Sequence, residues 1–318
     1  MSRAFVFPGQ GSQAVGMGRD LAQAFPAARL VFEEVDDALK QNLSKVMFEG
    51  PESELTLTAN AQPALMAVSV AVLRVLEAEA KLDLAKAAKF VAGHSLGEYS
   101  ALAAARTFAL ADAARLLRLR GEAMQKAVPV GEGAMAALLG LDVDAAKAVA
   151  AEAAKAPDGK TEVCQPANDN GGGQVVISGA KAAIDRSLEI AKSKGAKRAI
   201  PLPVSAPFHC ALMQPAADAM AEALSRTAMA PPRVPLVANV TASAVSDPAT
   251  IKDLLVQQVT AMVRWRESCL YMKDQGVTTL VELGAGKVLT GLAKRIDPEL
   301  SGVSAQTPAD IEALVKTL

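Results

Sequence analysis

The segment VAGHSLGE at residues 91–98 contains the pattern G-x-S-x-G, in which a serine lies between two glycines. An apolar run precedes the pattern and an alanine-rich helical pattern follows it, so Ser95 is expected on a sharp turn from a strand into a helix. Small flanking residues let such a turn close without side-chain clashes. A helix that begins just after Ser95 offers free N–H groups and a positive dipole end where an oxyanion would form. The pattern predicts a nucleophilic serine, although the same letters also occur by chance in unrelated loops.

A serine nucleophile needs a proton acceptor, and the chain has only two histidines. His94 adjoins Ser95, and neighbouring side chains at a strained turn point apart, so we expect His94 to be structural or to line a pocket wall. His209 lies in the loop VSAPFHC at residues 204–210, where an ordinary half-buried histidine is the simplest interpretation. The need of Ser95 for a base reverses that preference, because an imidazole with a pKa near ~6.5 both takes and returns a proton at neutral pH. We predict that His209 is the general base.

Arg120 lies on the apolar face of an expected helix over residues 110–128, together with Leu116, Leu117 and Met124. A buried charge without a partner is very costly. One interpretation is an internal ion pair with a protein carboxylate, and the residues alone favour it slightly. The other is a substrate carboxylate held by the planar guanidinium fork.

The loop at residues 8–11, PGQG, follows a short apolar strand and is expected beside the Ser95 turn, since both follow parallel strands. The backbone N–H groups of Gln10 and Leu96 then form an oxyanion hole, in which each donor stabilises the transition state by ~3 kcal/mol. Residues 9–14 also match the dinucleotide pattern G-x-G-x-x-A, but the acidic residues that follow belong to a helical pattern, so we reject nucleotide binding. The GAGK segment at residues 284–287 is interpreted as a tight strand-to-helix turn.

The elements that must position these residues alternate between strands and helices, which predicts an α/β fold with a largely parallel sheet. Expected strands of this core cover residues 4–7, 89–93, 234–240 and 278–283. Expected helices cover residues 21–39, 63–80, 96–105, 110–128, 251–259 and 265–275, with a final helix after residue 287.

A different pattern covers the middle of the chain. Its expected strands are residues 134–139, 162–167, 174–178 and 197–202, and its expected helices are residues 143–155 and 180–194. The order βαββαβ is that of a ferredoxin-like unit. We therefore predict a large domain of residues 1–128 and 201–318 into which a small ferredoxin-like subdomain of residues 129–200 is inserted.

Composition excludes several functional classes. The 318 residues carry 33 basic and 34 acidic side chains, which gives no support to a nucleic-acid surface or a polybasic membrane patch. Three widely separated cysteines form neither a disulfide framework nor a zinc cluster, so we expect no metal site. The apolar start of the chain is too short for a signal peptide, and the apolar segment 64–73 stops at Arg74, short of a membrane span. We expect a cytoplasmic protein that binds neither nucleic acid nor membrane.

Several segments together resemble the malonyl-CoA:acyl-carrier-protein transacylase family of bacterial type II fatty-acid synthesis. They are FVFPGQGSQ (5–13), QPAL (62–65), GHSLGEY (93–99), RG (120–121), QVVISG (174–179), PFH (207–209) and ELGAGKVL (282–289). These segments follow the family's order across almost the whole chain. The resemblance implies a hydrolase-like α/β domain with a ferredoxin-like subdomain, and an active site in the gap between them. The glycine run 171–173 departs from the family by being longer and looser.

The resemblance also implies a role for each motif residue. Ser95 is the nucleophile, His209 the base and Arg120 the clamp for a malonyl carboxylate. The backbone carbonyl of Gln258 would orient His209 in place of an acidic triad member, with the adjacent Gln257 as the alternative. Gln10 and Leu96 would form the oxyanion hole, and the pocket would be lined by Gln62, His94, Asn168 and Phe208.

The reaction so implied is transfer of malonyl from malonyl-CoA to the phosphopantetheine thiol of acyl carrier protein, through a malonyl-Ser95 ester and without metal or redox cofactor. We expect a monomer. The same chemistry in a polyketide pathway is not distinguished by the sequence. A serine thioesterase or esterase also uses G-x-S-x-G, but usually has an acidic triad member between the serine and the histidine. A carrier-protein docking module without catalysis would not need Ser95, His209 and Arg120.

Overall fold

The computed structural model describes residues 2–317, which form two β-sheets flanked by helices. The large sheet has six strands in the order β10-β9-β1-β2-β7-β8. All pairs of adjacent strands in this sheet are parallel except β7 and β8. Its strands are β1 (Arg3–Phe7), β2 (Phe90–Gly93), β7 (Leu236–Val237), β8 (Ala244–Val245), β9 (Thr279–Leu283) and β10 (Ser301–Ala305).

Strand β1 lies in the middle of the large sheet, and Ala4 to Phe7 are completely buried. Phe5 and Phe7 pack into one hydrophobic core and Ala4 and Val6 into another, because successive side chains of a strand point to opposite faces. The register pairs Phe7 of β1 with Gly93 of β2, so both strands end at the same level. The loops that leave them, at residues 8–11 and 94–96, therefore start side by side.

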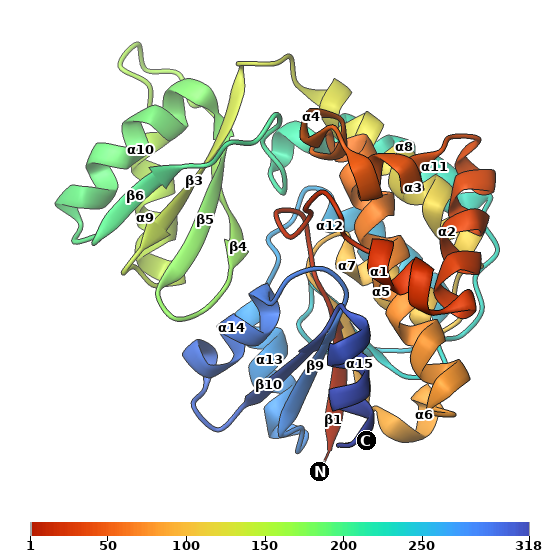
Figure 1. The fold of residues 1–318 in the computed structure, drawn as a ribbon. Helices are drawn as coiled ribbons and strands as arrows, with labels where there is room; N and C mark the ends of the chain where they lie inside the picture. Colours follow the sequence, from red (N-terminus) through yellow and green to blue (C-terminus); the bar gives the residue numbers. More distant parts are fainter. Residues whose placement is uncertain (1, 318) are drawn as a thin grey trace.

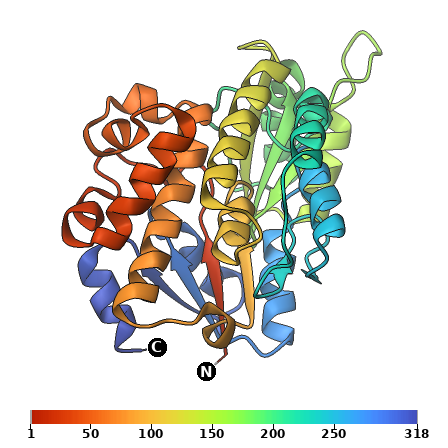
Figure 2. The ribbon, with the colours of Figure 1, turned by 90° about the vertical axis from the view of Figure 1, so that its right-hand side faces the viewer.

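Helices cover both faces of the large sheet. On one face α5 (Thr58–Glu79) and α7 (Gly97–Ala104) lie against the strands, and α2 (Pro26–Leu39), α8 (Leu110–Ala127) and α11 (Gln214–Ser225) complete the same hydrophobic core outside them. The other face packs against α13 (Trp265–Asp274) and α14 (Val288–Ile296). Figure 2 shows α5 (orange) and α8 (yellow) standing side by side over the sheet. The remaining helices are α1 (Arg19–Ala24), α3 (Leu43–Glu49), α4 (Glu52–Leu55), α6 (Leu84–Ala87), the 3-10 turn η1 (Ala211–Met213), α12 (Pro248–Gln258) and α15 (Pro308–Val315).

The small sheet has the order β4-β5-β3-β6 and is entirely antiparallel. It consists of β3 (Gly133–Leu139), β4 (Cys164–Asp169), β5 (Gln174–Ala180) and β6 (Arg198–Pro201), with α9 (Val143–Ala153) and α10 (Lys181–Ser193) on one face. The chain order βαββαβ with this strand order confirms the ferredoxin-like unit. Figure 1 shows it (green) set to one side of the larger body. The exact domain boundaries stay a prediction.

Helix α5 corrects two expectations. It begins at Thr58 rather than at Pro63, so the proline lies inside the helix. Proline removes one helical N–H bond, but the first turn is largely buried in the core, and that packing outweighs the loss. With 22 residues and a mean hydropathy of 1.4 in its most apolar 18-residue window, α5 is also long and apolar enough to span a membrane, contrary to the expected short segment. Since 89% of its apolar window is buried inside the protein, α5 is the central core helix.

Other differences have local causes. The expected helix 21–39 is divided into α1 and α2 at Phe25, because the proline at position 26 favours an extended preceding residue and starts a new helix. The expected strand 234–240 pairs only over β7, because the Ala238 N–H bonds to the Ser243 carbonyl in a turn. Strand β10 and helix α15 were missed after α14, since β10 is a half-exposed edge strand with only one large apolar side chain, Val303.

Candidate active site

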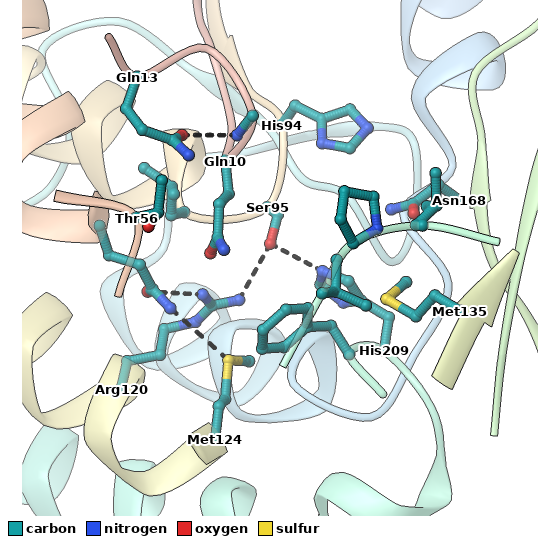
Figure 3. A pocket seen from close by; sticks show the side chains of 17 residues that line it. Gln10, Gln13, Thr56, His94, Ser95, Arg120, Met124, Met135, Asn168 and His209 are labelled. Atoms are coloured by element: carbon teal, nitrogen blue, oxygen red, sulfur yellow. Dashed lines mark hydrogen bonds between the residues drawn. The ribbon is translucent and has the colours of Figure 1, made fainter. Parts of the chain in front are cut away.

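Ser95 occupies the turn between β2 and α7, with a φ of +55° in the left-handed region. The two flanking glycines allow this turn, because a Cβ on Gly93 would lie 1.9 Å from the Gly97 carbonyl oxygen. A Cβ on Gly97 would lie 2.2 Å from the Phe7 carbonyl oxygen, so α7 starts directly against the end of β1. The strained turn expected from the sequence is therefore present, and it directs the Ser95 hydroxyl into a cavity (Figure 3).

The imidazole of His209 lies beside that hydroxyl, with 2.7 Å between Ser95 Oγ and His209 Nε2. On the other side of the ring, Nδ1 lies 2.9 Å from the backbone carbonyl oxygen of Gln258. A carbonyl only accepts, so Nδ1 carries the proton and Nε2 is left as the acceptor for the serine O–H. The geometry selects Gln258 over the exposed Gln257 as the residue that orients the imidazole.

Burial and charge both keep this histidine neutral. His209 is 4% exposed, and burial, followed by the positive charge of Arg120, lowers its pKa to about 3. A neutral imidazole is the form that accepts a proton, so His209 is available as a base throughout the neutral range. His94 has a different environment: its Nε2 lies 2.9 Å from Asn170 Oδ1 and its ring packs 5.8 Å from that of Trp265. It lines the cavity wall, as expected, without reaching the Ser95 hydroxyl.

Arg120 projects from α8 to the same hydroxyl and is only 1% exposed. Its Nη2 donates to Ser95 Oγ over 3.1 Å and to Gln258 Oε1 over 2.9 Å, and its Nη1 donates to Gln62 Oε1 over 2.8 Å. Among residues 2–317 no carboxylate lies within ion-pair distance of this guanidinium, so the internal ion pair favoured by the sequence is wrong. Its Nε–H is buried without any acceptor, which leaves donor capacity for an anion.

Two backbone N–H groups beside Ser95, those of Gln10 and Leu96, are the candidates for the oxyanion hole. Leu96 precedes the first residue of α7, and Gln10 lies in the loop after β1 that starts beside the Ser95 turn. Within the described chain, neither N–H has a hydrogen-bond acceptor, and both residues line the cavity. The side chain of Gln10 accepts a hydrogen bond from Thr58 Oγ1 over 2.7 Å, which fixes the loop against α5.

The cavity around Ser95 has a volume of about 600 Å³, within the usual range of small-molecule sites. It lies between the carboxyl end of the large sheet and the face of the small sheet that α9 and α10 leave uncovered. The sequence-predicted residues Gln62, His94, Asn168 and Phe208 all line it. Lining residues that the sequence analysis missed are Gln13, Thr56, Met124, Met135, Leu202, Pro203 and Val204. Met124 had a signal, since it lies one helical turn after Arg120 on the same face.

Two further polar residues behind the turn were missed. Asn239 bridges both sides of it, because its Oδ1 accepts from the Ser95 N–H over 2.9 Å and its Nδ2 donates to the Gly93 carbonyl over 2.7 Å. Glu98 is 1% exposed and accepts hydrogen bonds from the side-chain amide of Gln258 and the backbone N–H of Asn239. The motif contained Glu98, but only the structure shows that α7 is buried on every side.

The acyl transferase domain family matches residues 4–304 of this chain. The chain belongs to the acyl transferase family. It is 45% identical over 315 residues to the malonyl CoA-acyl carrier protein transacylase of Bacillus subtilis (strain 168), covering 99% of this chain and 96% of that one. It is 47% identical over 313 residues to the protein of the same name from Escherichia coli (strain K12), covering 98% of each. The family resemblance drawn from the motifs is thus confirmed.

Solved structures agree in fold. An acyl-carrier-protein-S-malonyltransferase from Bartonella henselae is 58% identical and superposes with a TM-score of 0.95, over 100% of this chain and 99% of that one. A malonyl-transacylase in complex with its type II PKS acyl-carrier protein is 43% identical with a TM-score of 0.94, over 100% of both chains. The protein is therefore an acyltransferase with the fold expected for that family. Residues 2–317 contain no group of three or more histidine, cysteine, aspartate or glutamate side chains placed to hold a metal ion.

Proposed function

We propose that this enzyme transfers a malonyl group from malonyl-CoA to the phosphopantetheine thiol of an acyl carrier protein, through a malonyl ester of Ser95. One observation supports this acyl group above others. The buried guanidinium of Arg120 lies 3.1 Å from the Ser95 hydroxyl and has no carboxylate partner in residues 2–317. A short acyl chain on Ser95 that ends in a carboxylate brings the missing negative charge to that guanidinium.

In the first half-reaction, His209 Nε2 takes the proton from Ser95 Oγ as the oxygen attacks the thioester carbonyl. The resulting oxyanion accepts hydrogen bonds from the N–H groups of Gln10 and Leu96. Its collapse breaks the carbon–sulfur bond, and the coenzyme A thiolate leaves with the proton from His209. The product is malonyl-Ser95 and a neutral imidazole, ready for the second half-reaction.

In the second half-reaction, the carrier's phosphopantetheine thiol gives its proton to His209 and attacks the serine ester. The tetrahedral intermediate then collapses, the bond between the carbonyl carbon and Ser95 Oγ breaks, His209 returns the proton to Ser95 Oγ, and malonyl-carrier is released. Each step moves one proton between sulfur, nitrogen and oxygen, and this scheme draws on no metal ion or redox cofactor. We place the reaction in the cytoplasm, carried out by a monomer.

Arg120 acts on the base as well as on the substrate. Its positive charge is the second cause of the low pKa of His209. A malonyl carboxylate that binds the guanidinium offsets that charge, so it raises the basicity of His209 as the correct acyl group arrives. An acetyl group leaves the charge unopposed and the base weak. The same contact thus selects malonyl in binding and in chemistry.

A thioesterase is less consistent with the site, because the acceptor of His209 Nδ1 is a backbone carbonyl rather than the acidic triad member such enzymes usually offer. A second candidate concerns the carrier. The solved transacylase that holds a type II PKS acyl-carrier protein is 43% identical over the whole chain, so a polyketide carrier is also a candidate acceptor.

Intact-mass analysis after brief mixing with malonyl-CoA tests the proposal. The wild type should gain one malonyl group and lose it when holo acyl carrier protein is added, while Ser95→Ala should gain none. Fatty-acid and polyketide carriers, added separately, identify the acceptor. An unmodified wild type, or an adduct that water removes as fast as the carrier does, would contradict the proposal.

A further inference from the structure

The side-chain amide of Gln258 connects Arg120 to a buried carboxylate. Its Oε1 accepts from Arg120 Nη2 over 2.9 Å. Its Nε2 donates to the carboxylate of Glu98, and also to the Ser95 carbonyl oxygen over 3.0 Å and to Asn239 Oδ1 over 3.3 Å. All atoms around the amide nitrogen are therefore acceptors, and the atom that faces the amide oxygen is a cationic donor.

These neighbours give the amide one stable orientation. If it rotated by half a turn, its NH₂ would face the guanidinium, donor against donor, and its oxygen would face three acceptors. The strong hydrogen bond of this amide is the one from the charged guanidinium of Arg120, and the contact with Glu98 holds the opposite end of the amide in the matching orientation. Glu98 is itself fixed, because its other oxygen accepts from the Asn239 N–H over 3.4 Å.

Glu98 interacts electrostatically with Arg120 but occupies none of its guanidinium donors. Burial raises the pKa of Glu98 to about 8 and outweighs the opposing effect of the Arg120 charge, so the group is largely neutral near pH 7 and holds the Gln258 amide by hydrogen bonding rather than by charge. The other titratable group that interacts with this carboxyl is Tyr99 on its own helix, whose ring lies 5.7 Å from the Arg120 guanidinium. A carboxylate bound directly to Arg120 would compete with a substrate carboxylate, whereas one that is separated from it by an amide does not.

We propose that Glu98 is a positioning residue for acyl selectivity, which acts through the Gln258 amide to hold the Arg120 guanidinium in place for the malonyl carboxylate. This inference rests on the proposed malonyl transfer. It assigns Gln258 two separable functions. Its backbone carbonyl orients His209 for every acyl group, and its side chain serves only acyl groups that bind Arg120.

The test compares kcat/KM for malonyl-CoA and acetyl-CoA in Glu98→Gln. The new amide can accept from only one of the two N–H donors that the carboxylate satisfies, so the Gln258 amide loses its fixed orientation. The malonyl-to-acetyl ratio should fall by about tenfold to a hundredfold, the range for losing a hydrogen bond to a charged group, here the one between the Gln258 amide and the Arg120 guanidinium. The value for acetyl-CoA should stay near that of the wild type, because the acceptor of His209 is a main-chain atom.

Glu282→Gln is the matched control. Glu282 is 0% exposed and, like Glu98, accepts two N–H donors, in this case the backbone N–H groups of Leu289 and Thr290 at the start of α14, but it does not line the cavity. Its substitution should lower the thermal midpoint and leave the malonyl-to-acetyl ratio unchanged. A fall in the ratio for both variants would show a general loss of structure and overturn the inference.

A double-mutant cycle with Gln258→Met completes the experiment, because methionine keeps the backbone carbonyl and removes the amide. If Glu98 acts through that amide, the double variant has the same ratio as Gln258→Met alone. Multiplying effects would overturn the inference. If Glu98→Gln does not fold, Gln258→Met decides alone: a ratio equal to that of the wild type contradicts the proposal. A wild type that forms no malonyl-enzyme would instead refute the proposed function.

Discussion

Replacing Arg120 by methionine is the sharpest test of the site. Methionine has a similar length and suits the apolar side of α8, so the substitution removes the charge without opening a large cavity. Removing one partner of a buried ion pair costs about 3–5 kcal/mol, because the other charge is left buried and unpaired. At about 1.4 kcal/mol per factor of ten, kcat/KM for malonyl-CoA should fall by about two to four powers of ten.

The same substitution should not lower kcat/KM for acetyl-CoA. In the wild type, an acetyl group leaves the guanidinium without a charge partner, and this penalty disappears with the arginine. The substitution also removes the second cause of the low pKa of His209, so the base becomes stronger. We expect kcat/KM for acetyl-CoA to stay equal or to rise.

The assay is the rate of acyl-enzyme formation with each thioester, followed by rapid quench and intact mass. Arg118→Met is the control, because Arg118 lies on the same helix and is also partly buried, but donates to Gln41 and does not line the cavity. That variant should keep the wild-type ratio of malonyl to acetyl. An Arg120→Met ratio equal to the wild type's would refute the carboxylate clamp, since the charge would then contribute nothing to selection.

Three further predictions concern stability and the oxyanion hole. The pKa of His209 is about 3 in the folded protein and near 6.5 in the unfolded chain, so the unfolded chain takes up a proton first as pH falls. Between pH 6.5 and 5, the wild type should therefore lose roughly 1–2 kcal/mol more unfolding free energy than His209→Gln in urea titrations. Equal losses would show that the imidazole is not buried in neutral form. Asn239→Ala leaves the Ser95 N–H and the Gly93 carbonyl unpaired and should lower the free energy of unfolding by roughly 2–4 kcal/mol in the same titrations. Gly97→Ala places a Cβ 2.2 Å from the Phe7 carbonyl oxygen, so it should displace the Leu96 N–H. We expect kcat to fall by about a hundredfold, which is the effect of losing one oxyanion donor. An unchanged kcat in single-turnover kinetics would exclude Leu96 from the oxyanion hole.

The sequence predicted the local features of the site better than its charge balance. G-x-S-x-G required a particular turn, and the scarcity of imidazoles left His209 as the acceptor, so both could be located without coordinates. Whether Arg120 had an internal carboxylate partner depended on contacts between distant segments, and helical periodicity shows only that a charge is buried. Glu98 and Asn239 were missed for the same reason, because each binds backbone groups far away in the chain.

The fold was predictable where apolar periodicity was strong and uncertain where tertiary packing decided. The alternation of strands and helices located β1, β2, β9 and the ferredoxin-like unit. Helix α5 extends beyond Pro63 because the surrounding core holds its first turn, which no local rule indicates. Strand β10 carries little apolar signal, since it lies at the sheet edge and its pairing with β9 comes from the backbone.

Using a main-chain atom to orient the imidazole has an evolutionary consequence. Gln258 is the last residue of α12, where carbonyl groups lack helical partners and carry the negative end of the helix dipole. The helix end thus supplies part of the negative potential that an aspartate would otherwise bring to the imidazolium. A carboxylate can be deleted by one codon change, whereas this acceptor persists through every replacement at position 258 that preserves the path of α12. Conservation of the hydrogen bond that orients His209 therefore depends on the path of a helix rather than on the identity of a side chain.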